Sequence, residues 1–312
     1  MEKCNNVKFP EICFYTWDIQ YECNYRCSYC FFNDNWEADK KKNRFPGIDK
    51  LKEQWDDIYK KYGTGHIHIT GGEPFAYPDF MELVEHLIRD FTVEFDTNLS
   101  FDADKFMARI GPDKVKFAAS FHPQFTDVDT FLNKALALKK AGYDIGVNYV
   151  AFPEQIQRMK EYKDRFAAVS IAFNVMPFRG KYKNMEYPDA YSEDERKLIC
   201  ECDPRTGGGM MKAYSSDKNG DKKEPPKPAN PHLGKPCRMG QMYTKIHPNG
   251  NAFRCCLAKE DGLLGNIIDN TFKFYEEAKP CAHDKCPCWV AMIVNEEQNW
   301  SFHWVTPSKP KV

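Results

Sequence analysis

Three cysteines near the amino end of the chain have the types and spacing needed to bind a metal cluster. Cys23, Cys27 and Cys30 form a C-x3-C-x2-C pattern just after the apolar run 12–20, which predicts a buried strand. Each iron of a four-iron cluster takes a sulfur ligand from the protein, so three thiolates leave one iron open. The spacing therefore predicts a [4Fe-4S] cluster whose open iron can bind a small molecule.

Zinc binding and disulfide formation are the alternatives for these cysteines. A C-x2-C pair is typical of zinc or redox sites, and three cysteines in a secreted chain would indicate disulfides. Zinc requires a fourth ligand close by, and the nearest histidine, His66, is far along the chain. A second motif, Gly-Gly-Glu-Pro at 71–74, follows the apolar stretch 66–70. Alone it would indicate an ordinary turn, but glycines also let a backbone approach a ligand closely.

Together, the two motifs resemble those of the radical S-adenosylmethionine (SAM) superfamily, which leaves zinc and disulfides as minor alternatives. In that family SAM chelates the open iron, and an electron from the cluster breaks a carbon-sulfur bond to leave a 5'-deoxyadenosyl radical. The resemblance implies that the second motif ends the second barrel strand and presents backbone groups to the amino group of SAM. Its residues are Gly71, Gly72, Glu73 and Pro74.

The same resemblance implies further contacts with SAM. In the family, the ends of the later strands contact the ribose, carboxylate and adenine, and an aromatic residue between the last two cluster cysteines lies beside the adenine. Polar residues at strand ends are also common turn formers, and an aromatic side chain near a cluster also suits ordinary packing. The candidates are Tyr29, Asn98, Ser120, His122, Asn148 and Met176.

The elements that must position these residues follow an alternating pattern from residue 12 to 178, which predicts βα units around a parallel sheet. Six such units cannot close an eight-stranded barrel, but they match the open partial barrel of the family, with its site at the carboxyl ends of the strands. The expected strands are 12–20, 66–70, 92–97, 115–120, 145–151 and 169–177. The expected helices are 50–62, 79–89, 103–110, 127–141 and 154–166.

A second group of cysteines lies in the last third of the chain. Cys237, Gly250 and Cys255 resemble the C-x(9-15)-G-x4-C opening of SPASM and twitch domains, and a hairpin of 242–247 and 251–256 would join the two cysteines. The resemblance implies an auxiliary [4Fe-4S] cluster completed by a cysteine pair, although C-x4-C-x-C replaces the usual C-x2-C here. The preferred ligands are Cys237, Cys255, Cys286 and Cys288, with Cys281 as the substitute. A zinc site with the same residues is the alternative.

The expected fold class is therefore α/β, a partial (β/α)6 TIM-like barrel with a small cysteine-rich auxiliary cluster domain at the carboxyl end. The expected parts are the barrel at 1–180, a helix with a linker or lid at 181–236, and the twitch/SPASM-like domain at 237–312. The stretch 203–235 lacks apolar periodicity, so a plain connector is favoured over a substrate-covering lid. Length alone allows about two domains.

Three other features could take part in chemistry. Cys256 follows a candidate ligand and is a candidate hydrogen-atom donor, with a small buried residue as the alternative. Cys200 and Cys202 are more simply a pair near a helix end than metal ligands. A basic loop just beyond the sixth strand could grip an anionic or hydroxylated substrate, although a solvated loop is the commoner outcome. Its residues are Arg179, Lys181 and Tyr182.

Composition limits the classes of partner. The chain has 312 residues, with 44 basic against 45 acidic side chains for a net charge of -1, so nothing predicts a general attraction to nucleic acid or membranes. The polar start 1–7 lacks the apolar core of a signal peptide, and no segment reaches the ~18 apolar residues that span a bilayer. We therefore expect a cytoplasmic protein, in which most of the 13 cysteines serve metal ligation rather than disulfides.

The function expected from the sequence is a radical SAM enzyme of the dehydrogenase or epimerase type. It would abstract a hydrogen atom from a small, carbohydrate-like molecule, while the auxiliary cluster accepts an electron or binds substrate. A flavodoxin- or ferredoxin-type protein would supply electrons. One alternative is a peptide- or protein-modifying maturase, disfavoured because only 22 residues precede Cys23. The alternative outside enzymes, an iron-sulfur carrier or scaffold, has no use for the second motif and an open iron. Oxidation, epimerisation and bond formation all stay open as the net reaction.

Overall fold

The computed structural model describes residues 12–30, 32, 35–203, 233–284, 286 and 289–295. Within these residues nine strands form one sheet in the order β12-β11-β10-β1-β2-β3-β4-β5-β6, and β1 to β6 are parallel. The predicted α/β partial barrel is confirmed. The six strands are β1 (Cys13–Gln20), β2 (Gly65–Gly71), β3 (Thr92–Thr97), β4 (Val115–Ser120), β5 (Asp144–Ala151) and β6 (Ala172–Pro177).

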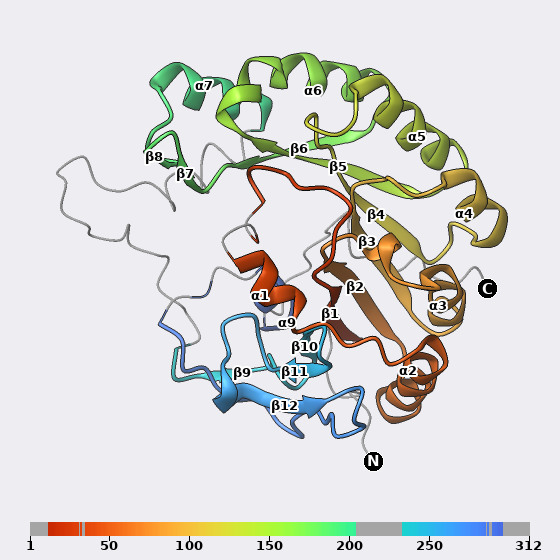
Figure 1. The fold of residues 1–312 in the computed structure, drawn as a ribbon. Helices are drawn as coiled ribbons and strands as arrows, with labels where there is room; N and C mark the ends of the chain where they lie inside the picture. The colour runs from red at the N-terminus through yellow and green to blue at the C-terminus, as the bar shows by residue number, and fades with distance from the viewer. Residues whose placement is uncertain are drawn as a thin grey trace.

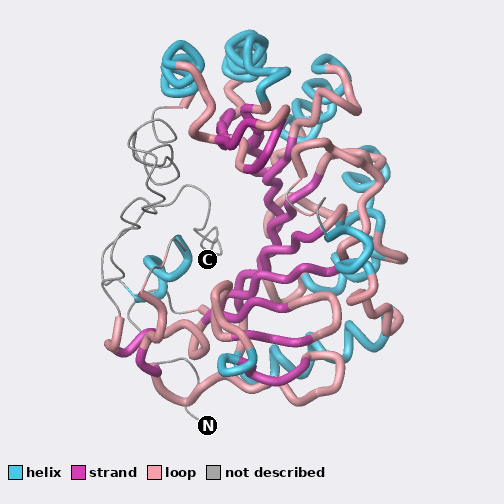
Figure 2. The backbone as a smooth tube through the Cα atoms, turned by 60° about the vertical axis from the view of Figure 1, so that its left-hand side comes forward, coloured by secondary structure: helices cyan, strands magenta, loops and turns pink. Residues whose placement is uncertain are grey.

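Helices cover the outer face of this curved sheet (Figure 1, Figure 2). Their positions agree with the sequence pattern, except that 154–166 begins as a 3-10 turn, Pro153–Arg158, before α6. They are α2 (Ile48–Tyr62), α3 (Phe80–Leu87), α4 (Ala103–Arg109), α5 (Val128–Lys140), α6 (Met159–Ala168) and α7 (Glu193–Cys202). No helix in the described ranges is both long and apolar enough to cross a membrane.

Alternation along the strands explains the packing. Tyr15 and Trp17 of β1 face the helices, and their rings lie 5.2 and 5.4 Å from that of the fully buried Trp55 in α2. The intervening residues Thr16 and Asp18 point to the opposite, inner face, because successive strand side chains alternate. The inner face of the sheet is therefore polar, which suits a barrel interior that receives a ligand.

Side chains fix where several helices begin. Asp102 and Asp127 cap α4 and α5 by accepting from the backbone N–H groups of Lys105 and Thr130, at 3.0 and 2.8 Å. Ser192 begins α7 with a reciprocal capping box. Such caps satisfy N–H groups that have no partner within the helix, and each typically contributes ~1 kcal/mol.

The predicted hairpin near the carboxyl end forms, and it joins the barrel sheet. β10 (Tyr243–Ile246) pairs in parallel with β1, and β11 (Asn251–Phe253) and β12 (Leu263–Asn266) extend the sheet at the end opposite β6 (Figure 1). Gly250 in the turn has φ +88°, and a Cβ there would lie 2.4 Å from Asn266 Oδ1. The hairpin is thus part of the same sheet as the barrel strands. The expected domain boundary at 237 stays a prediction.

Several shorter elements were not expected from the sequence. They are α1 (Trp36–Lys40), the hairpin β7 (Gly180–Tyr182) and β8 (Met185–Tyr187), the pair β9 (Pro236–Cys237) and β13 (Lys279–Pro280), and α9 (Trp289–Asn295). Most of the predicted connector or lid, 204–232, lies outside the described residues.

Candidate active site

The cysteine loop follows β1 and packs against the Gly-Gly-Glu-Pro segment that follows β2. The backbone N–H groups of Gly72 and Glu73 donate to the carbonyl oxygens of Gln20 and Glu22, both at 2.8 Å. A Cβ on Gly72 would lie 1.9 Å from the Glu22 oxygen, and one on Gly71, with φ +120°, would lie 2.2 Å from the Gln20 oxygen. These glycines are therefore required by the close approach of two backbones at the start of the cysteine loop.

Glu73 links the ends of β2 and β3. Its buried carboxylate accepts from the Thr97 hydroxyl and the Asn98 N–H, both at 2.8 Å, and from the Phe75 N–H at 3.1 Å. Burial raises the pKa of Glu73 to about 7, although these hydrogen bonds lower it. The carboxylate thus joins the segment after β2 to the end of β3 at the carboxyl edge of the sheet.

Asn98 connects β3 to the first cysteine. Its Nδ2 donates to Asn24 Oδ1 at 2.9 Å and lies 3.9 Å from Cys23 Sγ, while Asn24 Nδ2 donates to Ser100 Oγ at 2.8 Å. Lys134 of α5 donates to the carbonyl oxygen of Leu99 at 2.7 Å and so steadies the same turn. The predicted site residue Asn98 therefore lies beside Cys23.

Tyr29 and His122, both predicted site residues, are in contact. The Tyr29 hydroxyl is 3.0 Å from His122 Nδ1, and the Tyr29 ring lies 5.1 Å from that of Phe152. Burial lowers the pKa of His122 to about 4, so the imidazole is neutral near pH 7. The loop is also held by the segment that follows β4, because the Ser28 N–H donates to Gln124 Oε1 at 3.0 Å.

Three further candidates lie at the same edge of the sheet. Ser120, Asn148 and Asn174 are register neighbours on β4, β5 and β6, and Asn174 Nδ2 donates to Asn148 Oδ1 at 3.1 Å. Met176 lies two residues beyond Asn174 on the same face of β6. Asn174 was not predicted, because only the pairing of β5 with β6 puts it beside Asn148.

The inner face below this edge carries ion pairs that sequence analysis missed. Asp18 of β1 pairs with Lys245 of β10, and His68 Nε2 lies 3.1 Å from Asp96 Oδ1. Burial alone would lower the pKa of His68, but the Asp96 carboxylate raises it to about 9. The available signal was the polar residue at every second position of the strand patterns, but this alternation does not tell which pairs meet.

The three cysteines of the loop fit a cluster better than a single ion. Burial first, and the neighbouring thiols second, raise the pKa of Cys27 to about 12, so a metal is needed to hold it as a thiolate. Among the described residues no three His, Cys, Asp or Glu side chains are grouped to hold one metal ion. A four-iron cluster needs a wider arrangement, because each of its cysteines ligates a different iron.

The cysteines of the carboxyl end also gather. Cys237 in β9 lies opposite Lys279 of β13, and the N–H of Cys281 donates to the Lys235 carbonyl oxygen at 3.0 Å. Cys237, Cys255 and Cys281 are buried in one cluster, against which the half-buried Cys286 packs. This cluster includes Phe14, at the amino end of β1. Cys288 lies outside the described residues, so the preferred ligand set stays a prediction.

The remaining candidates occupy varied surroundings. Cys256 is exposed, so the alternative of a small buried residue is wrong, and its Sγ lies 3.2 Å from the Tyr243 hydroxyl. Cys200 and Cys202 lie in the last turn of α7, as expected. Arg179 and Lys181 are exposed, whereas the hydroxyl of Tyr182 donates to Glu154.

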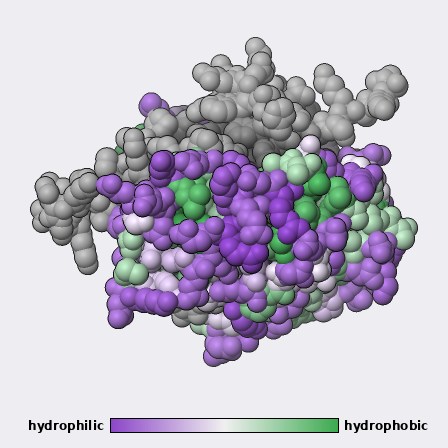
Figure 3. Space-filling model, turned by 90° about the horizontal axis from the view of Figure 1, so that it is seen from above, coloured by the Kyte–Doolittle hydropathy of each residue, from purple (hydrophilic) through white to green (hydrophobic). Residues whose placement is uncertain are grey.

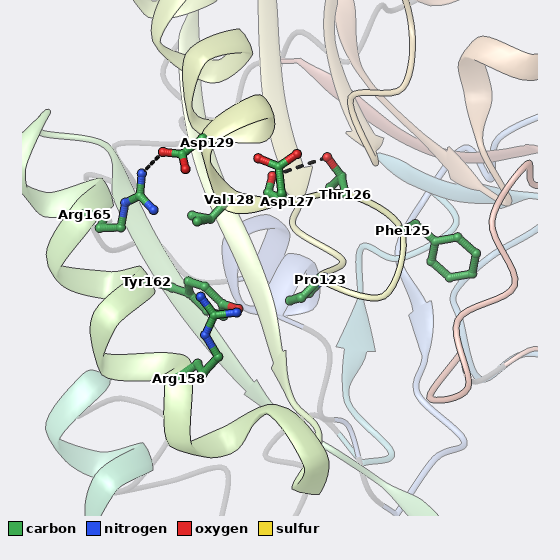
Figure 4. Close-up of a pocket in the computed structure, with 9 residues that line it drawn as sticks. All are labelled: Pro123, Phe125, Thr126, Asp127, Val128, Asp129, Arg158, Tyr162 and Arg165. Atoms are coloured by element: carbon green, nitrogen blue, oxygen red, sulfur yellow. Dashed lines mark hydrogen bonds and ion pairs between the residues drawn. The ribbon is translucent and has the colours of Figure 1, made fainter.

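A cavity of about 460 Å³ lies between the beginning of α5 and α6 (Figure 4). Arg165 pairs with Asp129 across it, and Arg158 lies over the ring of Tyr162, 4.9 Å from its centre. Seen from above, the described surface is mostly hydrophilic, with separate small apolar patches (Figure 3). Phe125, which lines the cavity, stacks on the ring of Tyr25 in the cysteine loop with 4.6 Å between the ring centres, so the cavity adjoins the candidate active site.

Comparison with known proteins identifies relatives of this chain. Residues 17–166 match the family described as the radical SAM superfamily. The chain is 21% identical to the antilisterial bacteriocin subtilosin biosynthesis protein AlbA of Bacillus subtilis, over 90% of this chain and 66% of that protein. It is 23% identical to the mycofactocin maturase MftC of Mycolicibacterium smegmatis, over 82% of this chain and 67% of that protein. A match of 40% identity to GTP 3',8-cyclase of Haemophilus ducreyi covers 63 residues, 20% of this chain and 18% of the cyclase.

Two solved structures share the fold. Native anSMEcpe with bound AdoMet superposes with a TM-score of 0.53 at 14% identity, over 83% of this chain and 79% of that one. Streptococcus suis SuiB bound to its precursor peptide SuiA superposes with a TM-score of 0.54 at 14% identity, over 84% of this chain and 65% of that one. The chain thus spans about two thirds of the length of AlbA, MftC and SuiB.

Proposed function

Because this chain belongs to the radical SAM superfamily, we propose that it modifies a peptide or a protein. It is a radical SAM enzyme, and the cofactors of its family are a [4Fe-4S] cluster and SAM, as expected from the sequence. The relatives that align along 82 to 90% of the chain are a bacteriocin biosynthesis protein and a maturase, and SuiB has been solved with a precursor peptide. The extent of this alignment along the chain is the observation that best supports the proposal.

The expected small-molecule substrate is supported less well. The cyclase is named for a nucleotide substrate, but it matches only a fifth of this chain. The length of chain before Cys23 does not bear on the choice, since the relatives themselves extend beyond the aligned part. The dehydrogenase or epimerase type expected from the sequence is also unsupported, because the relatives are named as maturases and cyclases.

In this proposal, Cys23, Cys27 and Cys30 hold the first cluster, and the edge of the sheet binds SAM. When bound, this cluster supplies the electron that splits SAM into methionine and a 5'-deoxyadenosyl radical, which takes a hydrogen atom from the substrate. Asn98 and Asn24 fix the cysteine loop against β3. The neutral His122 keeps Tyr29 in place beside the nucleoside, and Ser120, Asn148 and Asn174 offer polar groups to it.

The substrate would lie along the inner face of β1. Phe14 packs with the cysteines of the carboxyl end, and Gln20 precedes the cysteine loop. Six residue steps at ~3.3 Å put roughly 20 Å between these two ends. The ion pair of Asp18 with Lys245 lies between them. Because burying ions costs free energy, charges kept here favour a site for polar substrate groups over a purely structural core.

The cysteines of the carboxyl end would hold the auxiliary cluster. Cys237, Cys255 and Cys281 are already buried together, and Cys286 packs against them. Four thiolates satisfy a [4Fe-4S] cluster fully, so this cluster would exchange an electron with the substrate radical rather than bind SAM. Zinc with the same ligands stays the alternative, and iron analysis separates the two.

Deuterium transfer tests the substrate class. Cells of the source organism grown in D2O give a peptide and protein fraction and a separate metabolite fraction. Each is incubated anaerobically with reconstituted enzyme, SAM and dithionite, and deuterium in 5'-deoxyadenosine is measured by mass spectrometry. We expect deuterium from the peptide and protein fraction, and none with the Cys27→Ala variant. Transfer from the metabolite fraction alone would overturn the proposal.

A further inference from the structure

The last residue of α9 donates a hydrogen bond to a sulfur of the carboxyl-terminal cysteine cluster. Asn295 Nδ2 lies 3.4 Å from Cys237 Sγ. The orientation of the amide is fixed by two other bonds, because Asn295 Oδ1 accepts from the Arg238 N–H at 2.7 Å and Nδ2 donates to the Ala291 carbonyl oxygen at 2.7 Å. A side-chain amide has two N–H groups, so the second N–H is available for the sulfur.

With its proton on Nε2, a histidine makes the corresponding contact with a second cysteine. His283 Nε2 lies 3.5 Å from Cys255 Sγ, and His283 follows Cys281 by two residues. Both contacts are half-buried, where water screens a hydrogen bond less than it does at the surface. Two of the three buried cysteines thus have a nitrogen group directed at their sulfur from outside the cysteine set.

We propose that Asn295 and His283 are positioning residues that raise the reduction potential of the auxiliary cluster. This inference rests on the proposed function in one respect, the presence of a cluster on Cys237 and Cys255. Hydrogen bonds to the ligand sulfurs are among the factors that set the potential of an iron-sulfur cluster. An N–H group stabilises the more negative, reduced cluster more than the oxidised one, so its removal disfavours reduction.

α9 gives this role a structural basis. Val290 and Val294 of α9 are buried against the cysteines, so the helix is anchored on the same cluster that Asn295 contacts. The capping of the Arg238 N–H by Asn295 also ties α9 to the residue after Cys237. The helix therefore delivers one N–H group at a fixed place, as a tuning contact requires.

Redox titration of the full-length, reconstituted protein tests the proposal. The one-electron reduction of the auxiliary cluster is followed by electron paramagnetic resonance against dithionite, and its signal is identified in a chain with Cys23, Cys27 and Cys30 changed to Ala. We expect Asn295→Ala to lower the ratio of reduced to oxidised auxiliary cluster about tenfold at fixed potential, which is 59 mV for one electron. His283→Ala should shift the potential in the same direction.

Two further variants make the result decisive. Asn295→Asp keeps the acceptor for Arg238 but replaces the donating nitrogen with oxygen, so we expect a larger fall in potential. Gln241→Ala removes a nearby amide that donates to the Glu276 carbonyl oxygen, and it should leave the potential unchanged.

Iron and sulfide are counted in every sample. An unchanged potential in a fully loaded Asn295→Ala protein would overturn the inference. So would loss of the auxiliary iron from both Asn295 variants, since the residue would then retain the cluster rather than tune it. A wild-type chain that binds only the amino-terminal cluster would instead contradict the auxiliary cluster of the proposed function, and the inference with it.

Discussion

Replacing Gly72 by alanine should disconnect the cysteine loop from the second motif. The added Cβ would lie 1.9 Å from the Glu22 carbonyl oxygen and 2.4 Å from its carbon. Both are backbone atoms, so no side chain can turn away to make room, and the two segments must separate. Separation also weakens the hydrogen bonds from Gly72 to Gln20 and from Glu73 to Glu22, both now 2.8 Å long.

The expected cost follows from these two effects. Overpacking typically costs 1 to 3 kcal/mol, and each of the two backbone hydrogen bonds contributes ~1 kcal/mol. A total of about 3 kcal/mol for docking the loop corresponds to a loss on the order of a hundredfold in the population of the assembled site, since 1.4 kcal/mol is tenfold. The initial rate of 5'-deoxyadenosine formation and the affinity for SAM should both fall by a similar factor.

Gly111→Ala is the matched control. Gly111 is exposed, has no positive φ, and a Cβ there would meet nothing within 4 Å. This variant should cleave SAM as the wild type does, and auxiliary iron should stay bound in both variants as an internal measure of folding. Wild-type SAM cleavage and affinity in Gly72→Ala would refute the inference that this contact assembles the site.

Three other predictions concern the two cysteine groups and the inner face. Cys27→Ala should abolish 5'-deoxyadenosine formation, whereas Cys281→Ala should keep uncoupled SAM cleavage but lose product and auxiliary iron; equal loss of cleavage in both would contradict this division. The raised pKa of His68 stabilises the fold below pH 6.5, and this stability should be lost as the pH rises through about 9. Denaturant titration should find about 1 to 2 kcal/mol for it after solvent screening, and a His68→Gln chain with the same pH dependence would disprove it. Asp18→Asn alone should lower the free energy of unfolding by about 3 to 5 kcal/mol, because it leaves Lys245 buried without its partner, and adding Lys245→Met should restore most of that loss. The double variant should still not form product. Full product formation by the double variant would show that the pair is only structural.

Local sequence signals predicted most of the barrel because its elements are set by local periodicity. The expected strands 92–97 and 115–120 coincide with β3 and β4, and no end of the other four is wrong by more than three residues. The first cysteine motif was equally accessible, since three thiolates within eight residues need no long-range information. The capping aspartates before α4 and α5 mark the helix starts in the same way.

Long-range pairing could not be predicted from the same signals. β10 pairs with β1 across more than 220 residues, and nothing in the pattern of 243–246 specifies that partner. Lys245 therefore could not be placed beside Asp18, nor Asn174 beside Asn148. The glycines of the second motif were expected to make room for SAM, whereas their Cβ positions are occupied by the backbone of residues 20 and 22. A glycine motif indicates that some group approaches the backbone closely, but it does not indicate which group this is.

Strand β1 is the element that relates the two cysteine groups to each other. It pairs with β2, whose end docks the cysteine loop, and with β10, which leads through β11 to Cys255. Both pairings have defined registers, so the distance between the two groups is set by the length of β1 and not by a flexible linker. The roughly 20 Å from Phe14 to Gln20 is too long a span for one small group to bridge. Under the proposed function, a substrate that reacts at the first site and exchanges an electron with the second would therefore reach along the inner face past Asp18, and an extended peptide meets that requirement.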